Sequence, residues 1–552
     1  MKKYSVFCVS LVLLSFLSCA NSSAPQSTPV TVTHYQIPVD YAVPPNPVQG
    51  ASTPAQYDYA LFTRYAYSPE PRQLKAILVL MPGLYGGAGD FDAMARHIVT
   101  MSGGSVEVWA IDRRSMQIED LMGLQEAMRR HDPSIAYGYY FSGATVDGRT
   151  YAGPLPSSDI SYLSEWGLDM TLHDLNAVIS LVPAQYRKTN VILGGHSLGA
   201  WIVQDYAAYD FGSHASTTTD AGYNNVAGII LLDGGGTGLF PIMTEAEYLS
   251  GSAGDNVTLA GLSFSLPGVD QIRQVPDYVT PPGLLGSFGP IVAKALLFVQ
   301  IAGLYASLDP DALSPLMENT DFKTIAYLLL GGNTQLKATN LAMLGFYMDR
   351  HFDPIGTMTV TLGNANGPLA PSANPLLPGQ SMSRPTDYGT MVYTWNGAGH
   401  ISDIEDVADA LSNTYTTLTE WYFPMRLTVD VVAFGDSYGV TSTTDWRWTQ
   451  GLHVIHTPQM DAPVLAFGGM SGLEQTPAVF DTYRDMLPPA RDCNNQPRSA
   501  CGFDLHMMPG YTHMDILLSD PSVPAGAIDP TVYAWILKHT SGSIPVPVLP
   551  AP

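Results

Sequence analysis

Short unbroken apolar runs constrain the fold of this 552-residue chain more than any other feature. Runs of this length that do not alternate with polar residues are typical of parallel strands buried on both faces of a sheet. Between two of them, residues 168–182 place apolar side chains at helical spacing. Strands that alternate with helices predict an α/β sheet with right-handed crossovers. The runs are residues 75–83, 106–115, 190–195 and 224–235, and the pattern resumes at 462–469 and 502–515.

The residues between the fourth and the fifth apolar run do not follow this pattern. They contain Gly and Pro at short intervals together with many Tyr and Trp residues. The sequence therefore predicts a core formed by residues 56–236 and 461–540, interrupted by an inserted cap domain at 237–460. A Pro-rich tail follows at 541–552.

One long apolar segment, residues 284–308, lies within the insertion. It contains Lys294, Gln300, Gly289 and Pro290, which a lipid-spanning helix would have to accommodate. We interpret the segment as a buried helix of the cap. A lipid-facing lid helix is the alternative.

The sequence Gly195-His196-Ser197-Leu198-Gly199 follows the third apolar run and precedes a segment that can form a helix. In a tight turn between a strand and a helix, small residues on either side allow close approach to neighbouring strands. The serine hydroxyl then projects at the helix N-terminus. A serine is a weak nucleophile until a base removes its proton, so this interpretation requires a histidine elsewhere in the chain.

With this context, the pentapeptide resembles the nucleophile elbow of the α/β-hydrolase superfamily, in particular its lipase- and esterase-like serine hydrolases. The resemblance covers roughly residues 60–236 and 460–540. It implies an α/β-hydrolase fold: a mostly parallel eight-stranded sheet with helices on both faces, here with a large inserted cap domain. It also implies a Ser–acid–His triad and an oxyanion hole, with Ser197 as the nucleophile.

The resemblance places the base after the last core strand, where "MMPGYTHMD" contains His513. His400 also follows a strand-like run, but it falls within the insertion. Two positions compete for the acid. Asp233 directly ends the run "GIILLD", whereas Glu474 lies several residues beyond the run "VLAFGG". We favour Asp233 and keep Glu474 as the alternative acid.

The oxyanion hole of such enzymes uses two backbone amides. The resemblance assigns them to Leu198, directly after the nucleophile, and to Leu84, in the loop after the first apolar run. Pro82 stands where the family often has histidine, so the shape of this loop departs from the usual motif.

The N-terminus has the pattern of an export signal. Lys2 and Lys3 precede a short apolar run that ends in "FLSCA", which resembles a bacterial lipoprotein box with Cys19 as the lipidated residue. We therefore predict a signal peptide at 1–18 and a lipidated polar tether with an N-terminal strand at 19–55. Cleavage near this position without lipidation is the alternative.

Cysteine usage agrees with an exported protein. Once Cys8 and Cys19 are set aside, Cys493 and Cys501 remain in one polar loop, and we predict a disulfide between them. The expected location is the cell envelope, at the outer membrane or its periplasmic face or at the cell surface, with membrane association through the N-terminal lipid.

The formal net charge of −24 disfavours nucleic acid as a partner. No cofactor motif or metal-ligand cluster is recognised. "HVIH" at 453–456 has no matching ligands nearby, and "DRRS" at 112–115 is interpreted as lining the floor of the site or forming structural ion pairs. The sequence predicts an exported serine hydrolase that cleaves small-molecule or lipid-like carboxylic esters. A peptidase or amidase on the same fold, or a non-catalytic surface-binding lipoprotein, are the alternatives.

Overall fold

The computed structural model describes residues 29–551, apart from residues 214, 253–256, 260, 282–289, 319–334, 413–417, 436–438, 441 and 524–527. The predicted signal peptide, Cys19 and the first residues of the long apolar segment, 284–289, lie outside the described residues. None of the described helices combines the length and the apolar character that a membrane crossing needs.

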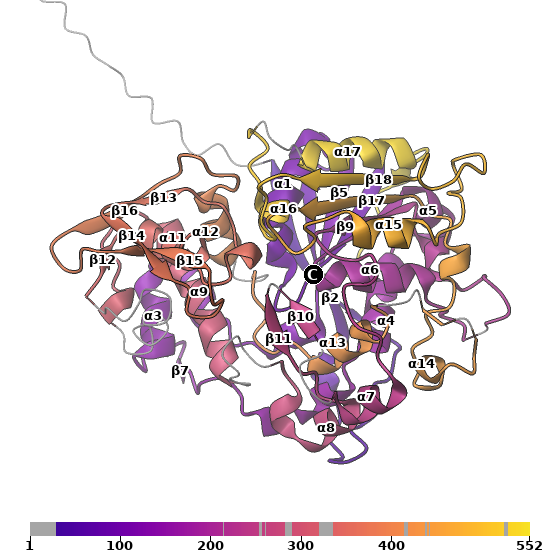
Figure 1. The fold of residues 1–552 in the computed structure, drawn as a ribbon, viewed down its shortest axis with the longest axis horizontal. Coiled ribbons are helices and arrows are strands. Elements are labelled where there is room, and N and C mark those ends of the chain that lie inside the picture. The colour runs from indigo at the N-terminus through magenta and orange to yellow at the C-terminus, as the bar shows by residue number, and fades with distance from the viewer. Residues whose placement is uncertain are drawn as a thin grey trace, which may run out of the picture.

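The core is an eight-stranded sheet (Figure 1). β2 runs antiparallel to both of its neighbours, and the six strands from β5 to β18 are parallel to one another. The predicted fold class is therefore confirmed. In their order across the sheet the strands are β1 (Val30–Pro38), β2 (Tyr59–Tyr67), β5 (Val106–Asp112), β4 (Ala76–Met81), β8 (Val191–His196), β9 (Gly228–Leu232), β17 (Val464–Gly469) and β18 (Phe503–Met508).

The apolar runs form this sheet because both of its faces are covered. Every residue of β4, β5, β8, β9 and β17 is buried. Helix α1 (Asp92–Met101) packs with α17 (Ile528–His539), and α4 (Leu168–Ile179) packs with α6 (Leu198–Ala208). The remaining elements of the core are α2 (Met122–Arg130), α3 (Pro133–Phe141), α5 (Ala184–Asn190), α15 (Ala478–Arg484), α16 (Asp515–Leu518) and the short strands β3 (Gln73–Leu74), β6 (Thr145–Val146), β7 (Arg149–Thr150) and β19 (Ile544–Pro545).

No described strand between β9 and β17 belongs to the main sheet. Part of this segment forms a lobe beside the sheet, and part, with α7, α8 and α13, lies below the sheet in this view, where α13 packs on α4 and α6 (Figure 1). Its described elements are α7 (Glu245–Ser250), β10 (Val257–Leu259), β11 (Leu262–Phe264), α8 (Val269–Gln274), α9 (Pro290–Leu308), β12 (Lys337–Ala338), α11 (Asn340–Met348), β13 (Asn364–Asn366), β14 (Leu369–Ala373), β15 (Ser381–Pro385), β16 (Val392–Asn396), α12 (Ile404–Ser412), α13 (Met425–Val432) and α14 (Trp446–Thr449).

Helix α9 occupies most of the long apolar segment and packs against α11 and α12. Leu297, Ile301 and Leu304 are almost fully buried. Gly303 permits the close contact with α12, because a Cβ atom there would lie 2.4 Å from the Cβ of Leu411. The described part of the segment is therefore a packed helix within the protein.

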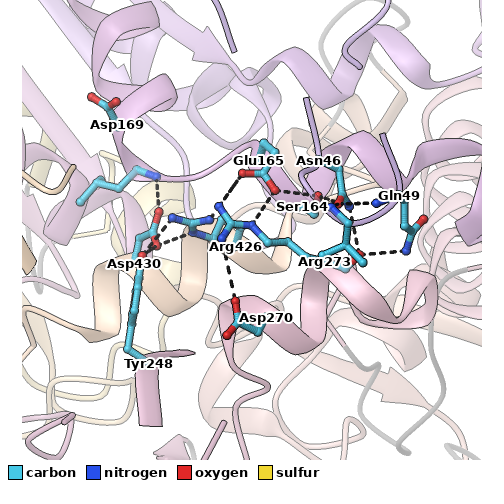
Figure 2. A network of polar contacts seen from close by, with 12 residues as sticks. Asn46, Gln49, Ser164, Glu165, Asp169, Tyr248, Asp270, Arg273, Arg426 and Asp430 are labelled. Carbon is cyan, nitrogen blue, oxygen red and sulfur yellow. Dashed lines mark hydrogen bonds and ion pairs between the residues drawn. The ribbon is translucent and has the colours of Figure 1, made fainter. Parts of the chain in front are cut away.

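A buried polar network joins the insertion to the core (Figure 2). Arg426 on α13 donates through Nε to Asp430 at 2.7 Å, and Tyr248 on α7 also donates to that carboxylate at 2.8 Å. Glu165, in the core, accepts two hydrogen bonds from Arg273 on α8 at 2.8 and 2.9 Å. The side chains of Asp430 and Glu165 are 2% and 4% exposed, so this attachment depends on charges that are out of contact with water.

The predicted disulfide is present. Cys493 and Cys501 are bonded to each other in the loop between α15 and β18.

Candidate active site

Ser197 stands at the turn between β8 and α6, with φ = 55° and ψ = −129°. This conformation is costly for a residue that has a side chain. The turn is possible because of its glycines: a Cβ on Gly195 would lie 2.2 Å from the Gly199 carbonyl oxygen, and a Cβ on Gly199 would lie 2.1 Å from that of Met81. The predicted elbow serine therefore sits on a strained turn at the start of a helix.

Asp233 follows β9, the strand next to β8 in the sheet. Its turn contacts the elbow, since a Cβ on Gly234 would lie 2.3 Å from the Ser197 carbonyl oxygen. The Asp233 carboxylate is fully buried and accepts hydrogen bonds from the backbone amides of Gly469, Leu473 and Glu474 at 2.7, 2.9 and 3.1 Å. These three donors hold the carboxylate in one orientation.

His513 lies in the loop after β18, and its Nδ1 is 2.6 Å from Asp233 Oδ2. A carboxylate at this position holds the proton on Nδ1 and leaves Nε2 free to act as a base. The two side chains are 4% and 0% exposed. Among the described residues, no hydrogen bond joins Ser197 Oγ to His513; such contacts are often long before substrate binds.

Glu474, the alternative acid, contributes its backbone amide to Asp233. Its carboxyl group is buried, and its Oε1 has no hydrogen-bond partner in the part of the chain that the structure describes. Burial and the neighbouring Asp233 carboxylate raise the pKa of Glu474 well above its ordinary value. In this structure the carboxylate in contact with His513 is that of Asp233.

His196 is a site residue that the sequence reasoning did not single out. Its ring packs on that of His513, with centroids 4.3 Å apart, and its Nε2 lies 3.2 Å from the His513 carbonyl oxygen. Burial and the neighbouring His513 lower the pKa of His196 well below its ordinary value, so this ring is neutral. Its position directly before the elbow serine was the only available signal. The rival histidine His400 instead contacts Gly397 and Asp520.

The insertion holds the histidine loop. The backbone amides of His513 and Met514 donate to the carbonyls of Thr357 and Thr359 at 3.0 and 3.2 Å. Asp515, which is fully buried, accepts hydrogen bonds from the backbone and side chains of Thr361 and Thr512 and from the hydroxyl of Ser402. Two of these three donor residues, Thr361 and Ser402, belong to the insertion.

The two predicted oxyanion donors lie on opposite sides of the nucleophile in the sequence but close to it in space. Leu198 is the first residue of α6, and Leu84 follows Gly83, where a Cβ would lie 2.7 Å from Ser197 Cβ. The N–H groups of Leu84 and Leu198 donate to no acceptor among the described residues. Two unpaired amides beside a serine are what a developing oxyanion requires.

Arg113 and Arg114, in the "DRRS" sequence, have separate roles. Arg114 forms ion pairs with Asp174 at 2.6 Å and Asp58 at 3.1 Å. Arg113 instead donates to backbone carbonyls of the loop that contains Leu84, and it pairs with Glu420 of the insertion.

No described group of three or more His, Cys, Asp or Glu side chains is arranged to hold a metal ion. His456, in "HVIH", is paired with Asp210 at 3.4 Å, and His453 packs on Trp448.

No family model and no curated protein sequence matches this chain. Solved structures with a similar arrangement include a monoglyceride lipase from Saccharomyces cerevisiae, at 12% identity over 92% of this chain and 100% of that one, with a TM-score of 0.28. A haloalkane dehalogenase from Bradyrhizobium elkani is 10% identical over 92% and 99%, with a TM-score of 0.33. A peroxisomal α/β-hydrolase from Saccharomyces cerevisiae is 8% identical over 94% and 93%, with a TM-score of 0.39.

The chain itself identifies the architecture. Its sheet has the order β1-β2-β5-β4-β8-β9-β17-β18, in which β2 runs antiparallel to β1 and β5, and a strand–turn–helix carries Ser197. This protein has the α/β-hydrolase fold.

Proposed function

We propose that this protein is a serine hydrolase that cleaves carboxylic esters through an acyl-enzyme. The observation that supports it most is the buried contact of 2.6 Å between His513 Nδ1 and Asp233 Oδ2, on turns adjacent to the strained elbow of Ser197. Strain at a buried polar turn is typical of a functional site rather than of a structural one.

In this proposal, Ser197 Oγ attacks the carbonyl carbon of the ester while His513 Nε2 accepts its proton. The amides of Leu84 and Leu198 stabilise the oxyanion of the tetrahedral intermediate. His513 then donates the proton to the leaving alcohol. Water, deprotonated by the same histidine, attacks the acyl-enzyme and releases the acid. In this scheme, Asp233 orients the ring of His513 and stabilises its imidazolium form.

The first test is labelling with a fluorophosphonate probe, followed by mass spectrometry of the labelled peptide. We expect a single modification on Ser197, and we expect the Ser197→Ala variant to remain unlabelled and to lose turnover by about 10⁴-fold or more. A folded wild-type protein that does not react, or one that reacts at another serine, would overturn the proposal.

A second test distinguishes esters from amides, since the same residues can hydrolyse both. p-Nitrophenyl acyl esters of increasing length are compared with p-nitroanilides of the same acyl groups. We expect ester hydrolysis to dominate by kcat/KM. A preference for the anilides would make the protein an amidase or peptidase.

We also propose that the protein is exported and anchored in the cell envelope by a lipid on Cys19. The signal-like residues 1–18 and the disulfide between Cys493 and Cys501 support this, because disulfides persist in oxidising compartments. The full-length protein, expressed in a bacterium, should enter the detergent phase on Triton X-114 partitioning. The Cys19→Ser variant should remain in the aqueous phase, and equal partitioning of the two would contradict the anchor.

A further inference from the structure

The side chain of Arg113 forms hydrogen bonds with several carbonyls of the loop that contains Leu84. Its guanidinium donates from Nη1 to the Pro82 carbonyl at 2.8 Å, and from Nη2 to those of Gly83 and Gly86 at 2.6 and 2.7 Å. Arg113 is 5% exposed. We call residues 82–86 the oxyanion loop, in the sense of the proposed function.

These contacts determine the direction of the Leu84 N–H. The peptide bond between Gly83 and Leu84 is trans, so its carbonyl and its N–H point in opposite directions. Because the Gly83 carbonyl points at Arg113, the Leu84 N–H points away from it. The Cβ position of Gly83 faces Ser197, at 2.7 Å from the serine Cβ. Arg113 therefore fixes the peptide plane that carries the Leu84 N–H, in a loop that lies against Ser197.

The loop needs such support because its own conformation is unfavourable. Tyr85 has φ = 60°, in the left-handed region that residues with side chains avoid. Its carbonyl accepts the backbone amide of Glu420 at 2.7 Å, and its hydroxyl donates to the Pro281 carbonyl at 3.0 Å. The residues that make these contacts, Tyr85, Glu420 and Pro281, lie in the oxyanion loop or in the insertion. None of the three belongs to a strand of the main sheet.

A buried guanidinium also needs a negative partner, and the insertion supplies it. Glu420 Oε2 accepts from Arg113 Nε at 2.8 Å and from Nη2 at 2.5 Å, and the Glu420 side chain is 0% exposed. Ser115 donates to the other carboxylate oxygen. The ring of Phe423 covers the guanidinium at 4.8 Å. The side chain is therefore held in one orientation by charge, hydrogen bonds and packing together.

We propose that Arg113 is a positioning residue for the reaction: held by Glu420, it sets the peptide plane that directs the Leu84 N–H at the oxyanion. This inference rests on the proposed function. Arg113 touches no reacting atom, and it acts only through the backbone of the oxyanion loop. Its contribution appears in the transition state, where the oxyanion is fully developed, and not in the binding of the uncharged ester.

The test compares Arg113→Lys with the matched control Arg114→Lys. Both replace a buried, ion-paired arginine, but Arg114 contacts Asp174 and Asp58 and not the oxyanion loop. A lysine keeps the charge for Glu420, yet its single ammonium lacks the fork that spans three carbonyls. Each variant is measured for unfolding temperature, for kcat and KM on the best p-nitrophenyl ester, and for inhibition by a trifluoromethyl ketone, whose adduct with serine carries an oxyanion.

We expect Arg113→Lys to lower kcat by about 10- to 100-fold, with KM changed by less than about threefold, and to weaken the ketone by a factor similar to the loss in kcat. Arg114→Lys should lose a comparable amount of thermal stability and keep kcat within about twofold. A folded Arg113→Lys variant that keeps both kcat and ketone affinity would overturn the inference, as would a loss confined to KM.

Glu420→Gln gives an independent variant if Arg113→Lys does not fold. It should reduce kcat and ketone affinity together, and the double variant should lose no more than the worse single variant, because the two side chains act as one unit. Additive losses of the two single variants would contradict this.

Fluorophosphonate labelling of the wild-type Ser197 separates the two proposals. If labelling succeeds and Arg113→Lys stays fully active, only the positioning role fails; if labelling fails, the proposed function fails and the positioning role fails with it.

Discussion

The sheet and the insertion reach the candidate site in different ways. Ser197 and Asp233 each follow a fully buried parallel strand, and His513 lies in the loop after β18, the partly exposed strand at the edge of the sheet, so their places depend on strands of one sheet. The insertion reaches the same site through separate polar contacts, such as Glu420 with the oxyanion loop and Thr357 with the amide of His513.

The difference matters because apolar burial and buried polar contacts respond differently to change. Burial of apolar surface is non-directional and tolerates small shifts, whereas a buried ion pair or hydrogen bond depends on one geometry and leaves a costly unpaired group when it is broken. The insertion therefore contributes contacts on which the loops of the candidate site depend. Single substitutions in it should alter the loops that carry the oxyanion donor and the histidine.

The largest effect should come from the acid that the sheet places behind His513. Asp233→Asn should lower kcat by about 10³- to 10⁴-fold, because an amide cannot stabilise the imidazolium or hold the required tautomer. Glu474→Gln is the control. It replaces a carboxyl whose pKa is raised by burial and by Asp233 with a neutral group of the same shape, and kcat should stay within about threefold. Steady-state kinetics with one ester measures kcat for both variants. An equal loss of kcat in the two would contradict the assignment of Asp233 as the acid.

The next largest effect should come from breaking the ion pair of Arg426, which helps to attach the insertion to the core. Asp430→Ala leaves the Arg426 guanidinium, whose side chain is 10% exposed, without its nearest partner, and should lower the free energy of unfolding by about 3–5 kcal/mol. Asp445→Ala is the control, since its pair with Arg447 also lies in the insertion but is more exposed, at 21% and 14%. It should cost about 1 kcal/mol or less. Denaturant unfolding measures both, and equal costs would show that burial of the Arg426 pair adds nothing.

A smaller effect is expected where the insertion supports the histidine loop. Asp515→Asn loses acceptor capacity toward donors of Thr361, Ser402 and Thr512, and should cost about 1–3 kcal/mol in unfolding and roughly tenfold in kcat. Ser402→Ala removes only one donor and should cost about 1 kcal/mol with little change in kcat. If Asp515→Asn destabilised the protein and left kcat untouched, the loop would not depend on this support.

The same contrast explains what could be predicted from the sequence. The strands β4, β5, β8, β9 and β17 are fully buried apolar runs, and Ser197 and Asp233 stand at the ends of two of them, so local pattern was sufficient to nominate these two residues. The strand β2 is not among the predicted apolar runs. Arg113 and Glu420 are 307 residues apart, and Glu420 lies in a segment without periodicity. No local signal links two single polar residues over that distance. The choice between Asp233 and Glu474 likewise needed three dimensions, because Glu474 approaches the site through its amide and not through its carboxylate.

Asp112 ends the core strand β5, yet its pKa depends in part on a residue of the insertion. Its carboxylate accepts the Ala88 amide at 2.7 Å, and burial, reinforced by the charge of Glu420, raises its pKa from 3.8 to about 7. Between these two values the unfolded chain has released a proton that the folded protein keeps. This carboxyl group therefore stabilises the fold fully below pH 3.8, and its contribution falls by about 1.4 kcal/mol per pH unit up to about pH 7, where it is lost.

Asp112→Asn removes this titration while keeping an acceptor for Ala88. The free energy of unfolding, measured by denaturant at pH 5 and pH 6, should fall by about 1 kcal/mol more in the wild type than in the variant. Glu420→Gln is the informative second variant. Removal of the neighbouring charge should lower the pKa of Asp112 and so narrow the pH range over which the free energy of unfolding declines. Arg114→Lys should leave this pH range unchanged. Equal pH dependence in the wild type, Asp112→Asn and Glu420→Gln would show that the core strand end and the insertion are electrostatically independent.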